Sequence, residues 1–324
     1  MTFNDSLPAT NVVYTINAGT VLSVNGTLTL SSGGPNVAAD VINTGTLNAL
    51  GDITVADTGG GMGGNAILQI GGAGTQTLTG AGSTTLGNLP TINIAKPSGT
   101  LNLASTIRTS NNWTYTSGTI NPGSSTVVFA ASLTITGTHT LGNVMFNDIL
   151  PATGTTYTIA AGTTLSASGT LTLSSGGINA SGDAINTGTL NALGDVTIAD
   201  SGGGIGGTAT LQIGGNGNQN FTGGGSATLG NLPRVNIAKT GGTLTLLSIL
   251  RTASNWIYTS GTIKSRNEHR RLRRDFDDHR FAHAGQRDLQ RQPAGVEFNL
   301  HHLNGHHSIC QQHANALQRR SRHI

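Results

Sequence analysis

A near-duplication with a constant offset of 143 residues constrains this chain more than any other feature. FNDSLPAT at 3–10 returns as FNDILPAT at 146–153, and NTGTLNALGD stands unchanged at 43–52 and 186–195. Self-similarity at a fixed period is the signature of repeat architectures, in which each unit buries its apolar face against the next. We therefore expect one structural unit to be built twice along the chain.

Within each copy the pattern predicts β-strands throughout. GTLTL at 26–30, GTLNL at 99–103 and TYTI at 156–159 alternate apolar and polar residues with period two. Gly, Asn, Asp and Ser separate these short runs, and no window shows the apolar period of a helix. We predict an all-β fold without helix over 1–263.

Two all-β architectures fit short strands, and the composition favours one of them. Tandem β-sandwich domains need units of about 100 residues with longer strands and more aromatic cores, whereas aromatic residues make up 4% of this chain. Stacked coils need only short strands and one small apolar side chain for each inward position. We expect a parallel β-helix (β-solenoid) with about 20 residues per coil, so that one copy forms about seven coils. The β-sandwich remains the alternative.

The repeat and the charge together divide the chain into three segments: copy 1 at 1–143, copy 2 at 144–263 and a basic tail at 264–324. Residues 1–263 carry five Lys or Arg against eight Asp, a net charge of −3, whereas the tail carries twelve against six acidic residues, or +6. The N-terminus lacks the basic and apolar regions of a signal peptide. We therefore expect no specific nucleic-acid binding by 1–263, and no run is long enough for membrane insertion.

The tail is explained as a third copy read in the wrong frame. Back-translation of RFAHAGQRDLQ at 280–290, read one base later, permits GSHTLGNVTFN, and residues 137–147 are GTHTLGNVMFN at the same 143-residue offset. Its written side chains place charges where a solenoid core would lie, and burial of unpaired charge is costly. We expect 264–324 to be disordered or poorly folded, with Met1 falling inside a repeat.

The tail also contains motifs that invite a functional interpretation. His301, His302, His306 and His307, with Cys310, have donor atoms suited to zinc or nickel. The run RRLRR at 270–274 has the charge to neutralise phosphates. Because a frameshift leaves such motifs unselected, we assign no metal site and no cofactor.

Catalysis on carbohydrates requires clustered carboxylates or a base beside a charged group. The body has no Glu, its eight Asp are scattered, and His139 is its one histidine. Asp52, Asp57, Asp195 and Asp200 are candidates if they converge on one face, and Asp57 or Asp200 alone makes a weak calcium ligand. We assign no catalytic residue, and a β-helix enzyme fragment remains the alternative function.

Pairs of threonines could form a binding array on an outward face. The pairs are Thr27/Thr29, Thr114/Thr116, Thr134/Thr136 and Thr170/Thr172. Each places two hydroxyls on one strand face, so a stacked array would suit ice or crystalline polysaccharide. Threonine is also a soluble strand former, which explains the pairs without any ligand. Trp113 and Trp256 are either exposed sugar-stacking residues or buried ones.

The segments VINTGTLNALGDITVADTGG at 41–60 and GGAGTQTLTGAGSTTLGNLPTINIAKPSGTLNL at 71–103 resemble the repeats of large bacterial secreted and cell-surface β-solenoid proteins. That class includes adhesins, filamentous-haemagglutinin-like proteins and autotransporter passengers, and the resemblance covers 1–263. It implies a right-handed parallel β-helix, export, and a non-enzymatic structural or adhesive role. Expected partners are surface glycans or neighbouring solenoid segments.

Overall fold

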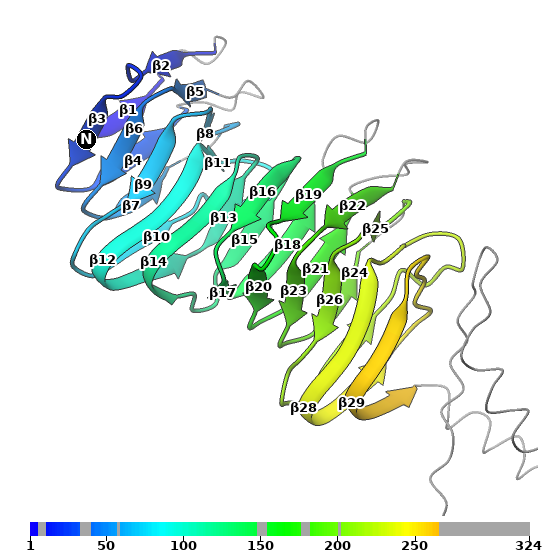
Figure 1. Ribbon diagram of the computed structural model, residues 1–324. Helices are drawn as coiled ribbons and strands as arrows, with labels where there is room; N and C mark the ends of the chain where they lie inside the picture. Colours follow the sequence, from blue (N-terminus) through cyan, green and yellow to red (C-terminus); the bar gives the residue numbers. More distant parts are fainter. Residues whose placement is uncertain are drawn as a thin grey trace, which may run out of the picture.

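The computed structural model describes residues 1–5, 11–32, 40–56, 59–147, 154–175, 182–199 and 202–265. These residues form 29 strands and no helix. Every pairing between strands is parallel, and the strands stack as a β-solenoid of about 10 turns (Figure 1). The all-β solenoid prediction is confirmed, and the β-sandwich alternative, which needs antiparallel sheets, is wrong.

The strands stack in three files that run along the solenoid. File 1 begins with β1 (Thr2–Asn4), β4 (Leu28–Ser31), β7 (Ile53–Val55) and β10 (Gln76–Thr79). It continues through the C-terminal halves of β12 (Thr91–Ala104) and β14 (Trp113–Asn121). Beyond β14 it contains β17 (His139–Leu141), β20 (Thr164–Ala167), β23 (Thr189–Ala192), β26 (Thr210–Ile213) and the N-terminal halves of β28 (Arg234–Leu246) and β29 (Trp256–Ser265).

File 2 shares the long bent strands β12 and β14 with file 1 but uses their N-terminal halves. Its other members are β3 (Val21–Val24), β6 (Thr46–Ala49), β9 (Ile67–Ile70), β16 (Leu133–Thr136), β19 (Thr156–Ile159), β22 (Asp183–Asn186) and β25 (Ile205–Gly206). A single long strand thus turns the corner between two files where other coils use two short strands.

File 3 contains all the remaining strands, and its first three join the rest through a bridge between Gly61 and Asn88. They are β2 (Val13–Thr15), β5 (Asp40–Asn43), β8 (Met62–Gly63), β11 (Asn88–Leu89), β13 (Thr106–Thr109), β15 (Thr126–Phe129), β18 (Asn143–Asn147), β21 (Leu171–Ser174), β24 (Val196–Ile198) and β27 (Gln219–Thr222). The C-terminal halves of β28 and β29 complete it.

Strand positions recur at the 143-residue offset, but equivalent strands lie in different files. For example, β2 at 13–15 corresponds to β19 at 156–158, and β4 at 28–31 to β21 at 171–174. β4 lies in file 1 and β21 in file 3, whereas β2 lies in file 3 and β19 in file 2. One copy therefore spans a number of turns that is not whole, and the next copy begins one file further round.

Coils are longer than the sequence pattern suggested. Paired residues are 17 apart between Thr126 and Asn143 but 28 apart between Thr156 and Ala184, and 25 is common. The expected 20-residue coil lies near the lower end of this range, so the expectation of about seven coils per copy is too high for about 10 turns. Corner segments between strands vary in length and account for the spread.

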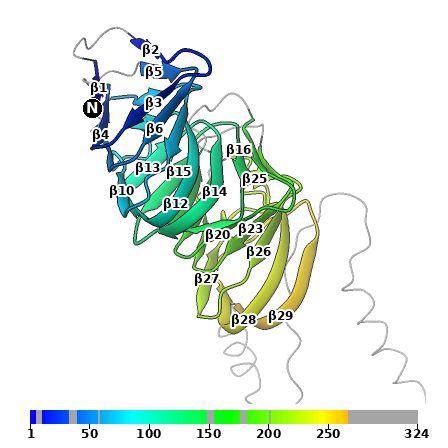
Figure 2. The same cartoon turned by 60° about the vertical axis from the view of Figure 1, so that its left-hand side comes forward.

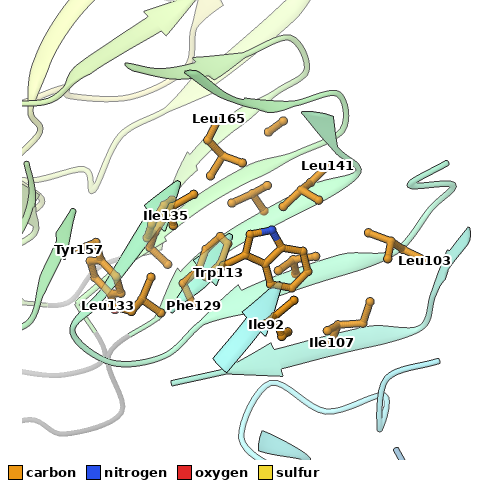
Figure 3. Close-up of a cluster of buried hydrophobic side chains, with 14 of the residues drawn as sticks. Ile92, Leu103, Ile107, Trp113, Phe129, Leu133, Ile135, Leu141, Tyr157 and Leu165 are labelled. Atoms are coloured by element: carbon orange, nitrogen blue, oxygen red, sulfur yellow. The ribbon is translucent and has the colours of Figure 1, made fainter. Parts of the chain in front are cut away.

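The core lies inside the stack, where equivalent inward positions form apolar columns. Leu28, Ile53, Leu78 and Leu103 pair in succession and are 0–5% exposed. Near the junction of the copies, aromatic side chains from different files meet in the core. The ring centroids of Trp113 in file 2 and Phe129 in file 3 are 6.0 Å apart (Figure 3). The ladders of files 2 and 3 cross this junction without interruption, whereas in file 1 β17 lies beside β14 without a strand pairing between them. A second view shows the continuous stack (Figure 2).

Candidate functional site

The most unusual buried group is the amine of Lys96, at 1% exposure. Its Nζ donates to the carbonyl oxygens of Gly72 (2.6 Å) and Gly74 (2.9 Å) and to Oε1 of Gln76 (2.6 Å). These three bonds use all three ammonium donors. Burial lowers the pKa of Lys96, a property shared with nucleophilic lysines, but its enclosure by protein oxygens indicates a structural role.

Copy 2 repeats this arrangement around Lys239, which is 2% exposed. Lys239 Nζ donates to the carbonyls of Gly215 and Gly217, both at 2.9 Å, and to Oε1 of Gln219. Burial lowers the pKa of Lys239 as well. Gln219 Nε2 extends the hydrogen-bond network to the preceding coil, because it donates to Gly194 O at 2.6 Å. The lysine and glutamine thus link successive coils at one corner, a role that sequence reasoning missed.

His139 forms a second buried polar group, close to Trp113. Trp113 Nε1 donates to His139 Nε2 at 3.1 Å, and His139 Nδ1 lies 2.7 Å from Gly137 O. A neutral ring with its proton on Nδ1 satisfies both contacts. Burial lowers the pKa of His139 and outweighs the opposing hydrogen bond to Gly137. The pair occupies the core, so Trp113 is not a surface residue for sugar stacking.

The four predicted carboxylate candidates do not form a described cluster. Asp52 Oδ1 accepts the backbone N–H of Thr77 at 2.8 Å, and Asp195 Oδ1 accepts that of Asn220 at the same distance. Asp52 precedes β7 in file 1 and Asp195 precedes β24 in file 3, so the two lie on different files. Asp57 and Asp200 lie outside the described residues.

Two aspartates that the sequence reading did not single out are more deeply buried. Asp40 and Asp183 are equivalent, 1% and 4% exposed, and accept backbone N–H groups at 2.8 Å from Val12 and Thr155 respectively. Burial, together with the carboxylates of Asp40 and Asp5, raises the pKa of Tyr14. Their shared position as the first residue of a DVIN or DAIN strand was the available signal. Their described bonds hold one coil to the next.

The threonine pairs do not stack into one two-column array. In file 1, Thr27 precedes β4 and Thr29 lies on it. In file 3, Thr170 precedes β21 and Thr172 lies on it. In file 2, Thr114 pairs with Thr136 and not with Thr134, so those two pairs are offset. A single threonine column does exist in file 1, formed by Thr2, Thr29, Thr54 and Thr79.

A two-column array is instead formed by threonines beside Ser, Asn and Gln. We call it the polar face, and it consists of the following residues on β20, β23, β26 and β28: Thr164, Ser166, Thr189, Asn191, Thr210, Gln212, Arg234 and Asn236. Ser166 is buried at 9% exposure, and the other members are half-buried or exposed. Asn191 Nδ2 donates to Ser166 Oγ and Gln212 Nε2 to Asn191 Oδ1, both at 3.4 Å. Strand spacing of about 4.8 Å makes the columns regular.

The equivalent surface of copy 1 is less polar. Val21 and Ile67 stand where copy 2 has Thr164 and Thr210, and they are 58% and 39% exposed. Because the copies step round by one file, this surface lies in file 2 and the polar face in file 1. The two copies therefore present related but chemically different surfaces in different directions.

The remaining expectations concern the tail motifs, metal binding, Trp256 and membrane insertion. The tail motifs, including His301, His302, His306, His307 and Cys310, lie outside the described residues. Where the structure describes the chain, no group of three His, Cys, Asp or Glu side chains is placed to hold a metal ion. Trp256 is half-buried on β29. No helix among the placed residues is long and apolar enough to cross a membrane.

Comparison with known proteins assigns this chain to no family. No family model, no curated protein and no solved structure matches this chain. The fold alone defines the class of this molecule, which is that of β-solenoid repeat proteins.

Proposed function

We propose that this chain is a non-enzymatic structural and adhesive segment of a secreted or cell-surface repeat protein, whose polar face binds polysaccharide. The observation that carries the proposal is the polar face itself, two in-register columns across four strands. One column contains three threonine hydroxyls and the Arg234 side chain, and the other contains Ser166, Asn191, Gln212 and Asn236. Regularly spaced hydroxyls and amides suit the repeating hydroxyls of an extended glycan. The buried Lys, Gln and Asp groups favour scaffolding, because their bonds join coils to one another.

The test is binding of the full chain to a glycan array, followed by measurements on the best ligand. Thr189→Val with Asn191→Leu should weaken retention at least about fivefold, because two polar contacts become unpaired. Thr197→Val, on β24 in file 3 of the same copy, is the matched control and should bind normally. Equal binding by all three proteins, or no glycan bound at all, would contradict the proposal.

The enzyme alternative is tested on the same material. The full chain is incubated with acidic and neutral polysaccharides, and released reducing ends are measured. We expect no turnover. Turnover lost in Asp52→Asn or Asp195→Asn would establish the alternative and remove the non-enzymatic role.

A further inference from the structure

One column of the polar face is identical in both copies of the repeat, and the other column is not. We call the first the constant column, and it reads Ser, Asn, Gln, Asn along successive strands: Ser23, Asn48, Gln69 and Asn93 in copy 1, and Ser166, Asn191, Gln212 and Asn236 in copy 2. We call the second the variable column, which keeps a threonine at one position and differs at the others: Val21, Thr46, Ile67 and Thr91 in copy 1, and Thr164, Thr189, Thr210 and Arg234 in copy 2. The two surfaces therefore share their amide groups and differ in the chemistry beside them.

Arg234 is the one charged residue in these columns. Its side chain is exposed, and its Nη2 donates to the carbonyl oxygen of Thr208 in the preceding coil at 3.2 Å. This bond holds the guanidinium close to the start of β26, where Thr210 pairs with Arg234. Among the described residues the guanidinium makes no other side-chain hydrogen bond, so its remaining N–H donors can reach a ligand.

The polar face offers no negative charge to neutralise this cation. Its strands β20, β23, β26 and β28 contain no acidic residue. A guanidinium presents its donors in a planar fork that matches the oxygens of a carboxylate, and charge-assisted hydrogen bonds of this kind are stronger than neutral ones. The face is thus complementary to a ligand that carries both hydroxyl groups and an acidic group.

We propose that the polar face selects an acidic polysaccharide and that Arg234 is its specificity-determining residue, an inference that rests on the proposed glycan binding. The guanidinium binds an acidic group of the sugar chain, a carboxylate or a sulfate, while the constant column binds its hydroxyls. The copy 1 surface has Thr91 in the equivalent place and exposed apolar side chains at Val21 and Ile67. It lacks the cation and does not share this selectivity.

The probes are pairs of oligosaccharides that differ only in charge: uronate oligosaccharides with their methyl esters, and sulfated oligosaccharides with their desulfated forms. Each is titrated into the full chain and followed by calorimetry. We expect an acidic probe to bind about tenfold more tightly than its neutral counterpart, because the charge-assisted bond forms only with the acid. The preferred pair identifies the acidic group as carboxylate or sulfate, and added salt should reduce the preference because it screens exposed charges.

Two variants test the role of Arg234. Arg234→Thr introduces the residue that copy 1 has at the equivalent position of the same strand pattern, so the coil should still form, and it should abolish the preference for the acidic probe. Lys264→Thr removes one positive charge from an exposed position on the C-terminal half of β29, in file 3. It is the matched control for net charge and should keep the preference.

The selectivity is overturned if no acidic probe is preferred over its neutral counterpart, if Arg234→Thr keeps the preference, or if Lys264→Thr loses it as well. Equal binding of both members of each pair overturns the selectivity alone and leaves the proposed glycan binding in place. Absence of binding by every probe, acidic and neutral, overturns both.

Discussion

Lys96 and Lys239 show at the scale of single residues how this solenoid holds charge inside its wall. Each ammonium replaces water with two backbone carbonyls and one glutamine oxygen. Among the described residues neither amine has a carboxylate partner, and burial lowers the pKa of each. Such an arrangement is stable only while all acceptors remain matched.

Substitution of Lys96 by Met should therefore destabilise the fold. The side chain keeps its volume but leaves the carbonyl oxygens of Gly72 and Gly74 without the lysine donor, while Gln76 Oε1 keeps only the N–H of Gly72, at a cost of about 3 kcal/mol. Lys264→Met, at an exposed position of β29, is the control and should change stability by less than about 0.5 kcal/mol. Urea unfolding followed by circular dichroism measures both, and equal midpoints would contradict the structural role.

His139 predicts a pH dependence. Its pKa in the folded chain lies below the unfolded value of about 6.5, so the unfolded state binds the proton more readily. The stabilisation is present above about pH 6.5 and is lost as the pH falls from there towards the folded pKa. The loss approaches about 1.4 kcal/mol per pH unit in that window.

The measurement is unfolding free energy at pH 5 to 8 for the chain and for His139→Gln. We expect the difference between their slopes to appear only below about pH 6.5. Parallel curves would show that His139 does not titrate on unfolding.

At the scale of strands and corners, glycine positions separate two kinds of constraint. Gly64, between β8 and β9, has φ +100° and a Cβ there would lie 2.3 Å from Ile42 O in the preceding coil. Gly19 has φ +77° but open space around it. At Gly64 both the backbone conformation and the contact with the preceding coil exclude a side chain. At Gly19 only the backbone conformation disfavours one.

Three alanine substitutions test this distinction. Gly64→Ala should cost several kcal/mol, Gly19→Ala about 1 kcal/mol from left-handed strain, and Gly26→Ala, with open space and no positive φ, close to zero. Thermal unfolding of the three variants gives the order. If Gly64→Ala is no worse than Gly19→Ala, the coils are not in contact at that corner.

For the whole molecule, the important property is the step of one file between copies. Equivalent surfaces point in different directions, so an array of such repeats would present each surface round the fibre. A ligand that binds one copy would then meet the next copy's equivalent surface on another side.

Spin-label distances test this step. Thr54 on β7 and Asn191 on β23 lie in the same file, six strand steps apart, or roughly 29 Å at about 4.8 Å per step. Thr54 and Thr197, which are equivalent by sequence, lie in different files and should be several ångströms further apart. A shorter Thr54–Thr197 distance would place the copies in phase.

Much of the fold was available from the sequence, whereas little of the candidate site was. The period-two alternation predicts strands, and the constant offset predicts that their positions recur. The polar face could not be found in this way, because Ser166, Asn191 and Gln212 are neighbours only through coils of 25 and 21 residues. The same reason hides the contacts of Lys96 with Gln76 and of Trp113 with His139.

The sequence by itself determined that this protein is a twofold β repeat, because strand propensity and alternation are local properties. Tertiary structure alone decided which residues of successive coils meet and which direction each copy faces. Corner segments of unequal length set the circumference of each coil, and 143 residues do not close a whole number of such coils. Equivalent strands such as β4 and β21 therefore lie in different files despite identical sequences.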